Sequence, residues 1–188
     1  MSRGDNQRSA RRGAAAAPEA FNVWVPVEVR YGDLDDQGHV NNALFFTYFE
    51  QGRIGYFNRI RAIGRASASM ADQPPAPAGR RSTVAPGASD DRLELPLVVS
   101  EASCAYRRPI ASLAPIVVGV RTARMGHASL VIEYVVSAAP DGTAYATGST
   151  TLVCVDLTSG RPRGLPHWAV AAVRQIEGQT DGQIEGEA

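Results

Sequence analysis

Hydrophobic and polar residues alternate over residues 23–31. Every second position carries Val or Tyr, while Glu28 and Arg30 fall on the opposite side of an extended chain. A period of two is typical of a β-strand with one buried face. The pattern therefore predicts a strand over 23–31 whose valines and Tyr31 face a core.

A dense run of large apolar residues follows over 43–57. Its members are spread around nearly the whole circumference of a helix: Leu44, Phe45, Phe46, Tyr48, Phe49, Ile54, Tyr56 and Phe57. A helix that is apolar on all sides must be covered by other structure. We expect a central helix that is wrapped by a sheet.

The later part of the chain contains strand-like runs over 95–107, 116–124, 129–138 and 144–156. Gly126 and Gly142 lie between the last three, and glycine supplies the positive φ that tight hairpin turns demand. These signals predict an antiparallel meander. With the first strand, the sequence predicts an α+β domain of about five antiparallel strands around one long helix.

Composition divides the 188 residues into one domain with irregular additions. Residues 1–20 are rich in Arg and Ala and lack the apolar core of a secretory signal, which predicts a flexible leader and a cytoplasmic protein. A single domain is expected over 21–166. Within it, 67–91 is rich in Pro, Gly, Ala and Ser, which predicts a long mobile insertion loop or a lid. Residues 167–188 predict a short helix at the rim of the sheet and a disordered tail.

Charge and cysteine usage exclude several classes. All 19 basic residues are Arg and are balanced by 19 acidic residues, so a formally neutral chain has no electrostatic reason to bind nucleic acid or a membrane surface. The absence of Lys, with much Ala, Gly and Pro, favours a bacterial source. Cys104 and Cys154 predict two buried thiols rather than a disulfide. The histidines lack ligand spacing, so no metal and no cofactor are expected.

The junction between the first strand and the helix carries the candidate chemistry. It holds Asp33, Asp35, Asp36, Gly38, His39, Asn41 and Asn42. A helix N-terminus has unpaired N–H groups and a partial positive charge, so anionic chemistry is favoured there. Either asparagine also fits an N-cap, which is the ordinary structural role of such a residue. Three aspartates within four positions favour a reactive site.

The segment GDLDDQGHVNNALFFTYFEQGR resembles the signature of the hot-dog-fold acyl-CoA thioesterases of the 4-hydroxybenzoyl-CoA thioesterase type. The likeness includes an Asp-x-Asp pair, a Gly-His-Val-Asn-Asn run and a Tyr-Phe-Glu-x-x-Arg helix segment. It continues through AYRRP, RMGHASLVIEY, ATGSTTLVCVD and GRPRGLP. Leu113-Ala114-Pro115 stands where members often carry Gly-Asp, so the substrate is less defined than the reaction.

The resemblance implies hydrolysis of a fatty or aromatic acyl-CoA to free acid and CoA. Asp35 matches the second Asp of the pair and is the expected nucleophile or general base. Asn42 matches the residue whose backbone N–H points at the thioester oxygen, where the helix dipole adds to carbonyl polarisation. Because thiolate is a good leaving group, no Ser-His-Asp arrangement is required.

Other residues are expected to support the substrate, and structural roles compete for several of them. Gly38 would allow close approach of the loop or form a turn, and His39 would donate to the acyl carbonyl or hold the loop. Glu50 is expected to pair with Arg53 rather than to act as an acid. The residues expected to bind substrate are Asp33, Gly38, His39, Asn41, Arg107 and Arg108, with Arg161 and Arg163 as further candidates for the CoA phosphates.

An exposed sheet edge and the resemblance together predict a homodimer or homotetramer. Two other classes stay open besides the thioesterase. A non-catalytic acyl-CoA-binding hot-dog protein would keep the pocket without turnover. A hot-dog dehydratase would carry an Asp-x-Asn-Pro-x-His run, which this chain lacks, and the leader is too short for the DNA-binding module of a regulator.

Overall fold

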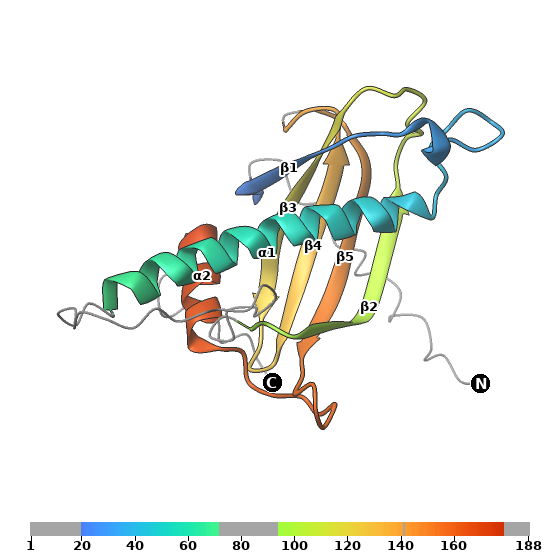
Figure 1. Cartoon of the computed structure of the whole chain (residues 1–188). Helices are drawn as coiled ribbons and strands as arrows, with labels where there is room; N and C mark the ends of the chain where they lie inside the picture. Colours follow the sequence, from blue (N-terminus) through green and yellow to red (C-terminus); the bar gives the residue numbers. More distant parts are fainter. Residues whose placement is uncertain (1–19, 72–93, 141, 179–188) are drawn as a thin grey trace, which may run out of the picture.

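The computed structural model describes residues 20–71, 94–140 and 142–178. The elements are β1 (Val23–Val27), the 3-10 helix η2 (Tyr31–Asp33), α1 (Leu44–Ala71), β2 (Leu97–Tyr106), β3 (Ile116–Met125), β4 (Ser129–Ser137), β5 (Ala144–Cys154) and α2 (His167–Glu177). Figure 1 shows α1 lying across one face of the sheet. This is the predicted hot-dog arrangement. The expected tail, and nearly all of the expected leader and insertion loop, lie outside the described residues.

The sheet has the predicted five strands, all antiparallel, in the order β1-β3-β4-β5-β2. A simple meander would have placed β2 beside β3, and that expectation is wrong. β2 pairs with β5 at the opposite edge instead. The connection over 107–115 crosses from that edge to β3, and buried Ile110 accepts a hydrogen bond from the Val40 N–H on the way (2.9 Å). Burial of the Ile110 side chain offsets part of the conformational entropy that is lost when this long connection is ordered.

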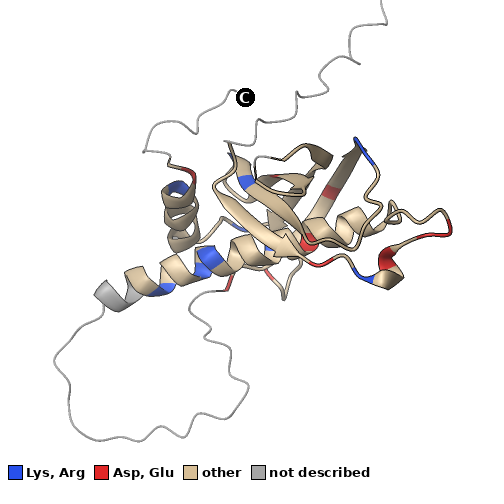
Figure 2. Ribbon diagram, turned by 90° about the horizontal axis from the view of Figure 1, so that it is seen from above, with Lys and Arg blue, Asp and Glu red and all other residues tan. Residues whose placement is uncertain are grey.

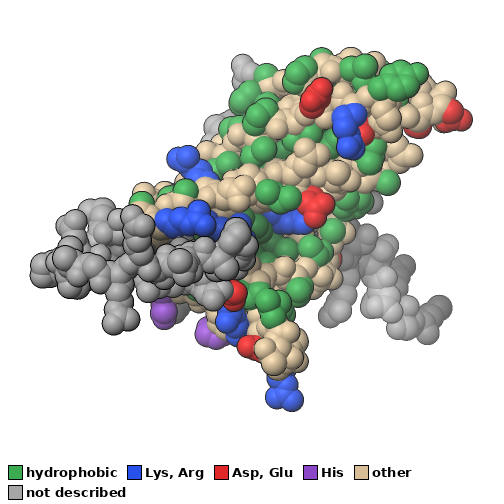
Figure 3. All heavy atoms as spheres, in the orientation of Figure 1, with side chains coloured by type: hydrophobic (Ala, Val, Ile, Leu, Met, Phe, Trp, Pro, Cys, Tyr) green, Lys and Arg blue, Asp and Glu red, His purple; other side chains and the backbone are tan. Residues whose placement is uncertain are grey.

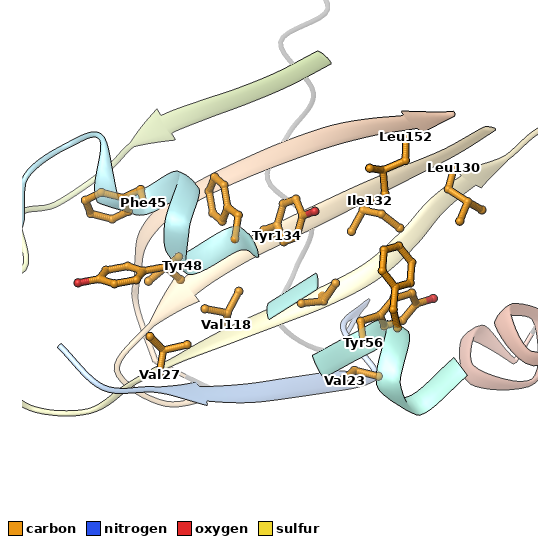
Figure 4. Packing of buried hydrophobic residues seen from close by; sticks show 14 of the residues in the cluster. Val23, Val27, Phe45, Tyr48, Tyr56, Val118, Leu130, Ile132, Tyr134 and Leu152 are labelled. Atoms are coloured by element: carbon orange, nitrogen blue, oxygen red, sulfur yellow. The ribbon is translucent and has the colours of Figure 1, made fainter. Parts of the chain in front are cut away.

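The core lies between α1 and the inner face of the sheet. Figure 4 shows Tyr48 and Tyr56 of α1 in one apolar cluster with Tyr134 and its neighbours on the strands. The Phe49 ring stacks on Tyr134 with centroids 4.7 Å apart. Stacked aromatic rings add to the stabilisation that comes from buried apolar area.

Two features of α1 differ from the prediction. The helix continues to Ala71, past residue 67, where the insertion loop was expected to begin. In addition, Ile54 is 53% exposed and Phe46 is exposed, so this chain covers α1 on one side only. The expectation that the sheet wraps the whole helix is therefore wrong for a single chain.

The first strand is shorter than predicted. β1 ends at Val27, and although Val29 is buried, Tyr31 is 83% exposed rather than facing the core. The reason is local: the Arg30 N–H and Nε–H both donate to the Asp33 carboxylate (3.0 Å each), which turns the chain into η2. The alternation of apolar residues continues past the end of the hydrogen-bonded strand.

The hairpin glycines serve a different purpose from the one predicted. Among described glycines, positive φ occurs at Gly38, Gly160 and Gly178, and neither Gly126 nor Gly142 has it. A Cβ at Gly126 would lie 2.8 Å from Ser129 Oγ, and one at Gly142 would lie 3.0 Å from the Ala139 backbone. A side chain at either position would crowd its neighbour, so these glycines leave room in the turn and do not supply a positive φ. Asp141 of the second turn lies outside the described residues.

The C-terminal helix α2 forms at the start of the 167–188 segment, where a short helix was predicted, and packs against α1 and β3. Its last residue, Glu177, accepts hydrogen bonds from the Tyr56 hydroxyl (2.6 Å) and from the Thr122 N–H (2.8 Å). Burial and the Glu177 carboxylate raise the pKa of Tyr56, so the phenol remains a donor. Cys104 and Cys154 are free thiols, as predicted, but only Cys154 is buried, and Cys104 is half-buried because it lies on the edge strand β2. None of the described helices is long and apolar enough to cross a membrane.

Candidate active site

The loop between η2 and α1 is a tight hairpin closed by a bridge between Leu34 and Val40. The Asp35 N–H donates to the His39 carbonyl (2.8 Å), and the Gly38 N–H donates to the Asp35 carbonyl (3.0 Å). Gly38 has a φ of 75°, in the left-handed region where a residue without Cβ is favoured. The loop conformation therefore depends on its own backbone and on this glycine.

The Asp35 side chain is half-buried and is held by the same loop. Its Oδ1 accepts hydrogen bonds from the N–H groups of Gln37 (2.9 Å) and His39 (3.2 Å). Within the described part of the chain, Oδ2 has no hydrogen-bond partner. One oxygen is thus committed to the loop, which orients the carboxylate, while the other is available to a reactant.

Asp33 has a different environment, although it lies only two positions away. Its side chain is 2% exposed and accepts from Tyr48 Oη (2.8 Å) and from the Arg30 guanidinium (2.8 Å to Nη2). Burial acts to raise the pKa of Asp33, but the hydrogen bonds from Arg30 and Tyr48 outweigh it and hold that pKa below its usual value. Its carboxylate ties the loop to α1.

The start of α1 leaves one amide unpaired. The Asn41 side-chain oxygen caps the turn by accepting from the Ala43 N–H (2.9 Å), and the Asn41 carbonyl accepts from the Leu44 N–H (2.9 Å). The Asn41 N–H donates to the Asp33 carbonyl (2.9 Å). Among the described residues, the Asn42 N–H donates no hydrogen bond to a backbone or side-chain acceptor. The amide selected from the sequence is therefore free to donate, and Asn41 rather than Asn42 provides the cap.

These features gather at one end of the molecule. The Asn41–Asp33 and Tyr48–Asp33 hydrogen bonds hold the Asp35 loop beside the N-terminus of α1, and Figure 2 shows the acidic stretch of this loop in red on the ribbon at that end. The positive end of the helix dipole stabilises negative charge that develops there. A carboxylate can act as a nucleophile or a general base, and a free backbone N–H can stabilise an oxyanion.

The expected CoA-binding arginines are divided between two ends of the sheet. Arg107 and Arg108 follow β2, close to the loop, and their backbone N–H groups both donate to the Tyr145 carbonyl (2.8 and 3.0 Å). Both side chains are exposed. Arg163 instead donates its N–H to the Cys154 carbonyl, at the opposite end of β5, and Arg161 lies beside it. One chain does not bring all four together.

Of the remaining predicted residues, Glu50 has an ion-pair partner, whereas the His39 side chain has no hydrogen-bond partner among the described residues. The expected ion pair between Glu50 and Arg53 is present at 3.7 Å, and Arg53 Nη1 also donates to Tyr134 Oη (3.4 Å). The His39 imidazole is half-buried, with no hydrogen-bond partner among the described residues. Its backbone, rather than its side chain, holds the loop.

Sequence reasoning missed Arg30, Tyr48 and Tyr106. Arg30 and Asp33 are opposite charges three positions apart, a spacing that the sequence shows and that suits a local ion pair. Tyr48 looked like an ordinary core residue, and its hydroxyl carried no signal. Tyr106 contacts the start of α1 from 64 positions away, a distance at which no sequence period applies.

The fold and this loop define a hot-dog protein with a carboxylate and a free amide at the start of its central helix. Residues 29–173 match the Thioesterase-like superfamily, so the chain belongs to that family. It is similar to the uncharacterized protein YsmA of Bacillus subtilis, with 25% identity over 76% of this chain and 78% of that protein.

Solved structures agree with the assignment. A thioesterase from Thermus thermophilus, crystallised with coenzyme A and Zn, is 34% identical in sequence, with a TM-score of 0.62. The match covers 86% of this chain and 98% of the Thermus chain. A putative thioesterase of Pseudomonas aeruginosa, PA2801, is 26% identical with a TM-score of 0.58, covering 81% and 98%.

Proposed function

We propose that this protein hydrolyses an acyl-CoA thioester to a carboxylic acid and CoA, with Asp35 as the reacting carboxylate and the Asn42 N–H as the carbonyl-polarising donor. One observation carries the proposal. Asp35 Oδ2 and the Asn42 N–H are both without a partner among the described residues, and both belong to the junction at the start of α1. Family membership supports the same reaction class.

The chemistry follows one of two routes. In the first, Asp35 Oδ2 attacks the thioester carbonyl, the C–S bond breaks, and CoA leaves as a thiolate; water then hydrolyses the mixed anhydride and regenerates the carboxylate. In the second, Asp35 removes a proton from a water molecule that attacks the carbonyl, and that proton passes to the departing thiolate. In both routes the Asn42 N–H stabilises the oxyanion.

Binding of the CoA moiety is assigned to Arg107 and Arg108. Both guanidinium groups are exposed just after Tyr106, whose hydroxyl reaches the start of α1. Charge-assisted hydrogen bonds from arginine suit phosphate oxygens. The Thermus neighbour was crystallised with coenzyme A, which supports a CoA-type ligand here. A cytoplasmic location is part of the proposal, because free thiols are typical of a reducing compartment.

We also propose that two copies join through β2. This ten-residue strand has one sheet neighbour, carries Glu101 as its one charge, and includes exposed Val98 and Val99. Long edge strands with few charges pair with another chain unless they are protected. Pairing of β2 with its copy would extend the sheet and cover these valines, which favours a homodimer or a dimer of dimers.

The first experiment measures CoA thiol release from short, medium, long and aromatic acyl-CoAs. Asp35→Asn keeps an Oδ1 that can accept from the loop amides but removes the reacting carboxylate, so we expect kcat/KM to fall by about a hundredfold or more. Asp36→Asn is the matched control, because the Asp36 side chain is exposed and makes no hydrogen bond or ion pair within the described residues. It should retain wild-type turnover.

The outcomes separate the classes. Release by the wild type and by Asp36→Asn, but not by Asp35→Asn, would support the proposal. Equal turnover in Asp35→Asn would remove Asp35 from the reaction. Tight acyl-CoA binding by the wild type without any thiol release would favour the non-catalytic binding protein.

A further inference from the structure

Tyr106, at the far edge of the sheet, contacts Asn42, the residue whose N–H is the proposed oxyanion donor. It is the last residue of β2, and its hydroxyl donates a hydrogen bond to the Asn42 carbonyl (3.0 Å). Its ring packs edge-on against Phe45, with centroids 5.3 Å apart and planes at 77°. Strand β2 and the first turn of α1 are therefore joined by one side chain.

The Asn42 backbone has few other restraints. On its N-terminal side, the Asn41 carbonyl is held by the Leu44 N–H at 2.9 Å. On its C-terminal side, the Asn42 carbonyl receives a long bond from the Phe45 N–H at 3.4 Å, so Tyr106 is the shorter of its two hydrogen bonds. Hydrogen bonds weaken with distance, and the tyrosine is thus the main anchor on that side.

The chain after Tyr106 also holds the other side of the loop. The Ile110 carbonyl accepts from the Val40 N–H at 2.9 Å, and Ile110 is buried. Residues 106–110 therefore contact the backbone at both Val40 and Asn42, which brackets Asn41. The Asn42 carbonyl can only accept, so Tyr106 must be protonated to donate. Tyr106 is 46% exposed, and partial desolvation and the neighbouring Cys104 raise its pKa, so the hydroxyl is a donor at neutral pH.

We propose that Tyr106 is a positioning residue for catalysis: its hydroxyl holds the Asn42 backbone so that the unpaired Asn42 N–H faces the thioester carbonyl oxygen. This inference rests on the proposed hydrolase function. A preorganised donor is worth most when its orientation is fixed before the oxyanion forms. Loss of the anchor should therefore lower kcat more than it changes substrate binding.

The test compares Tyr106→Phe with Tyr145→Phe. The first change keeps the ring against Phe45 and removes the hydroxyl; the second removes a hydroxyl that has no hydrogen-bond partner among the described residues. For Tyr106→Phe we expect kcat to fall about threefold to tenfold with KM within about twofold, as for loss of one neutral hydrogen bond. The Ala43, Leu44 and Phe45 amides should exchange hydrogen faster. Tyr145→Phe should leave kcat, KM and the exchange rates of these amides unchanged.

The outcomes distinguish this inference from the proposed function. Unchanged kcat in Tyr106→Phe, with an active wild type, would overturn the inference and leave the hydrolase intact. A raised KM with unchanged kcat would make Tyr106 a substrate contact and would also overturn it. No turnover by the wild type on any acyl-CoA would overturn the proposed function first, and faster amide exchange in Tyr106→Phe would then show an anchor without a catalytic role.

Discussion

At the scale of single residues, Asp33 and Asp35 show how neighbouring carboxylates acquire different roles. Asp33 is enclosed, and both of its oxygens accept hydrogen bonds from Arg30 or Tyr48. Asp35 is half-buried and has one oxygen satisfied by loop amides. A buried carboxylate persists only when it is fully hydrogen-bonded, so Asp33 serves stability. Asp35, which keeps one oxygen without a partner among the described residues, is the carboxylate that we propose to react.

This difference predicts that Asp33→Asn lowers the stability of the fold by an amount that depends on pH. The substitution removes the charge from hydrogen bonds with Tyr48 and Arg30, so the free energy of unfolding should fall by about 2 kcal/mol near neutral pH. The folded pKa lies below the usual 3.8. The contribution of Asp33 is therefore complete above about pH 5 and is lost as the pH falls through the folded pKa.

Urea unfolding at neutral and acidic pH measures this effect. The difference in unfolding free energy between wild type and Asp33→Asn should shrink on acidification, while the exposed Asp36→Asn should stay within about 0.5 kcal/mol of wild type. A difference that is the same at both pH values would show that the charge of Asp33 contributes nothing to stability.

At the scale of secondary-structure elements, missing side chains decide how closely α1 approaches the sheet. A Cβ at Gly52 would lie 2.7 Å from Val118 Cγ1, and one at Gly55 would lie 2.6 Å from Val25 Cγ2. From the opposite side, Gly148 of β5 leaves room for the Phe49 ring. Protein interiors are close-packed, so these positions determine where the helix lies and hence where its N-terminus meets the Asp35 loop.

Gly148→Ala should therefore destabilise the fold. The added Cβ would overlap the Phe49 ring and the Ser103 carbonyl, at a cost of about 1–3 kcal/mol for overpacking. Gly32→Ala is the control, because nothing lies within 4 Å of a Cβ there. Thermal unfolding should show a clear drop for the first variant and little change for the second. Equal unfolding midpoints for the two variants would mean that α1 can shift to accommodate the added Cβ without loss of stability.

At the scale of the whole molecule, one chain leaves apolar surface that a hot-dog core would be expected to cover. Phe46 and Ile54 of α1 are exposed, as are Val98 and Val99 of β2. Figure 3 shows apolar side chains on the face that carries α1. Contiguous exposed apolar surface commonly marks a protein interface. A second copy is the partner that edge pairing through β2 favours.

We expect analytical ultracentrifugation to give two or four times the 20.0 kDa mass of one chain. Val99→Glu would place like charges at the proposed interface and should shift the protein toward monomer, because unpaired buried charges are costly. Leu157→Glu makes the same change at a residue that is exposed and outside β2. Monomeric wild-type protein, or an intact oligomer in Val99→Glu, would exclude β2 as the interface.

The local features of this protein were predictable from its sequence. Alternation with a period of two, strand-like apolar runs and the dense apolar segment over 43–57 involve only neighbouring positions, so they identified the strands and the central helix, and a short C-terminal helix was predicted as well. The Asp-x-Asp and Gly-His-Val-Asn-Asn run located the loop and the family for the same reason. The Glu50–Arg53 pair followed from helical spacing.

The tertiary structure decided what depends on distant contacts. The place of β2 beside β5, the exposure of Tyr31 and the environments of Asp33 and Asp35 were not set by any period along the chain. The bond from Tyr106 to Asn42 joins residues 64 positions apart. Sequence patterns report which face of an element is apolar, whereas only folding determines which element meets that face and which polar atoms remain without a partner.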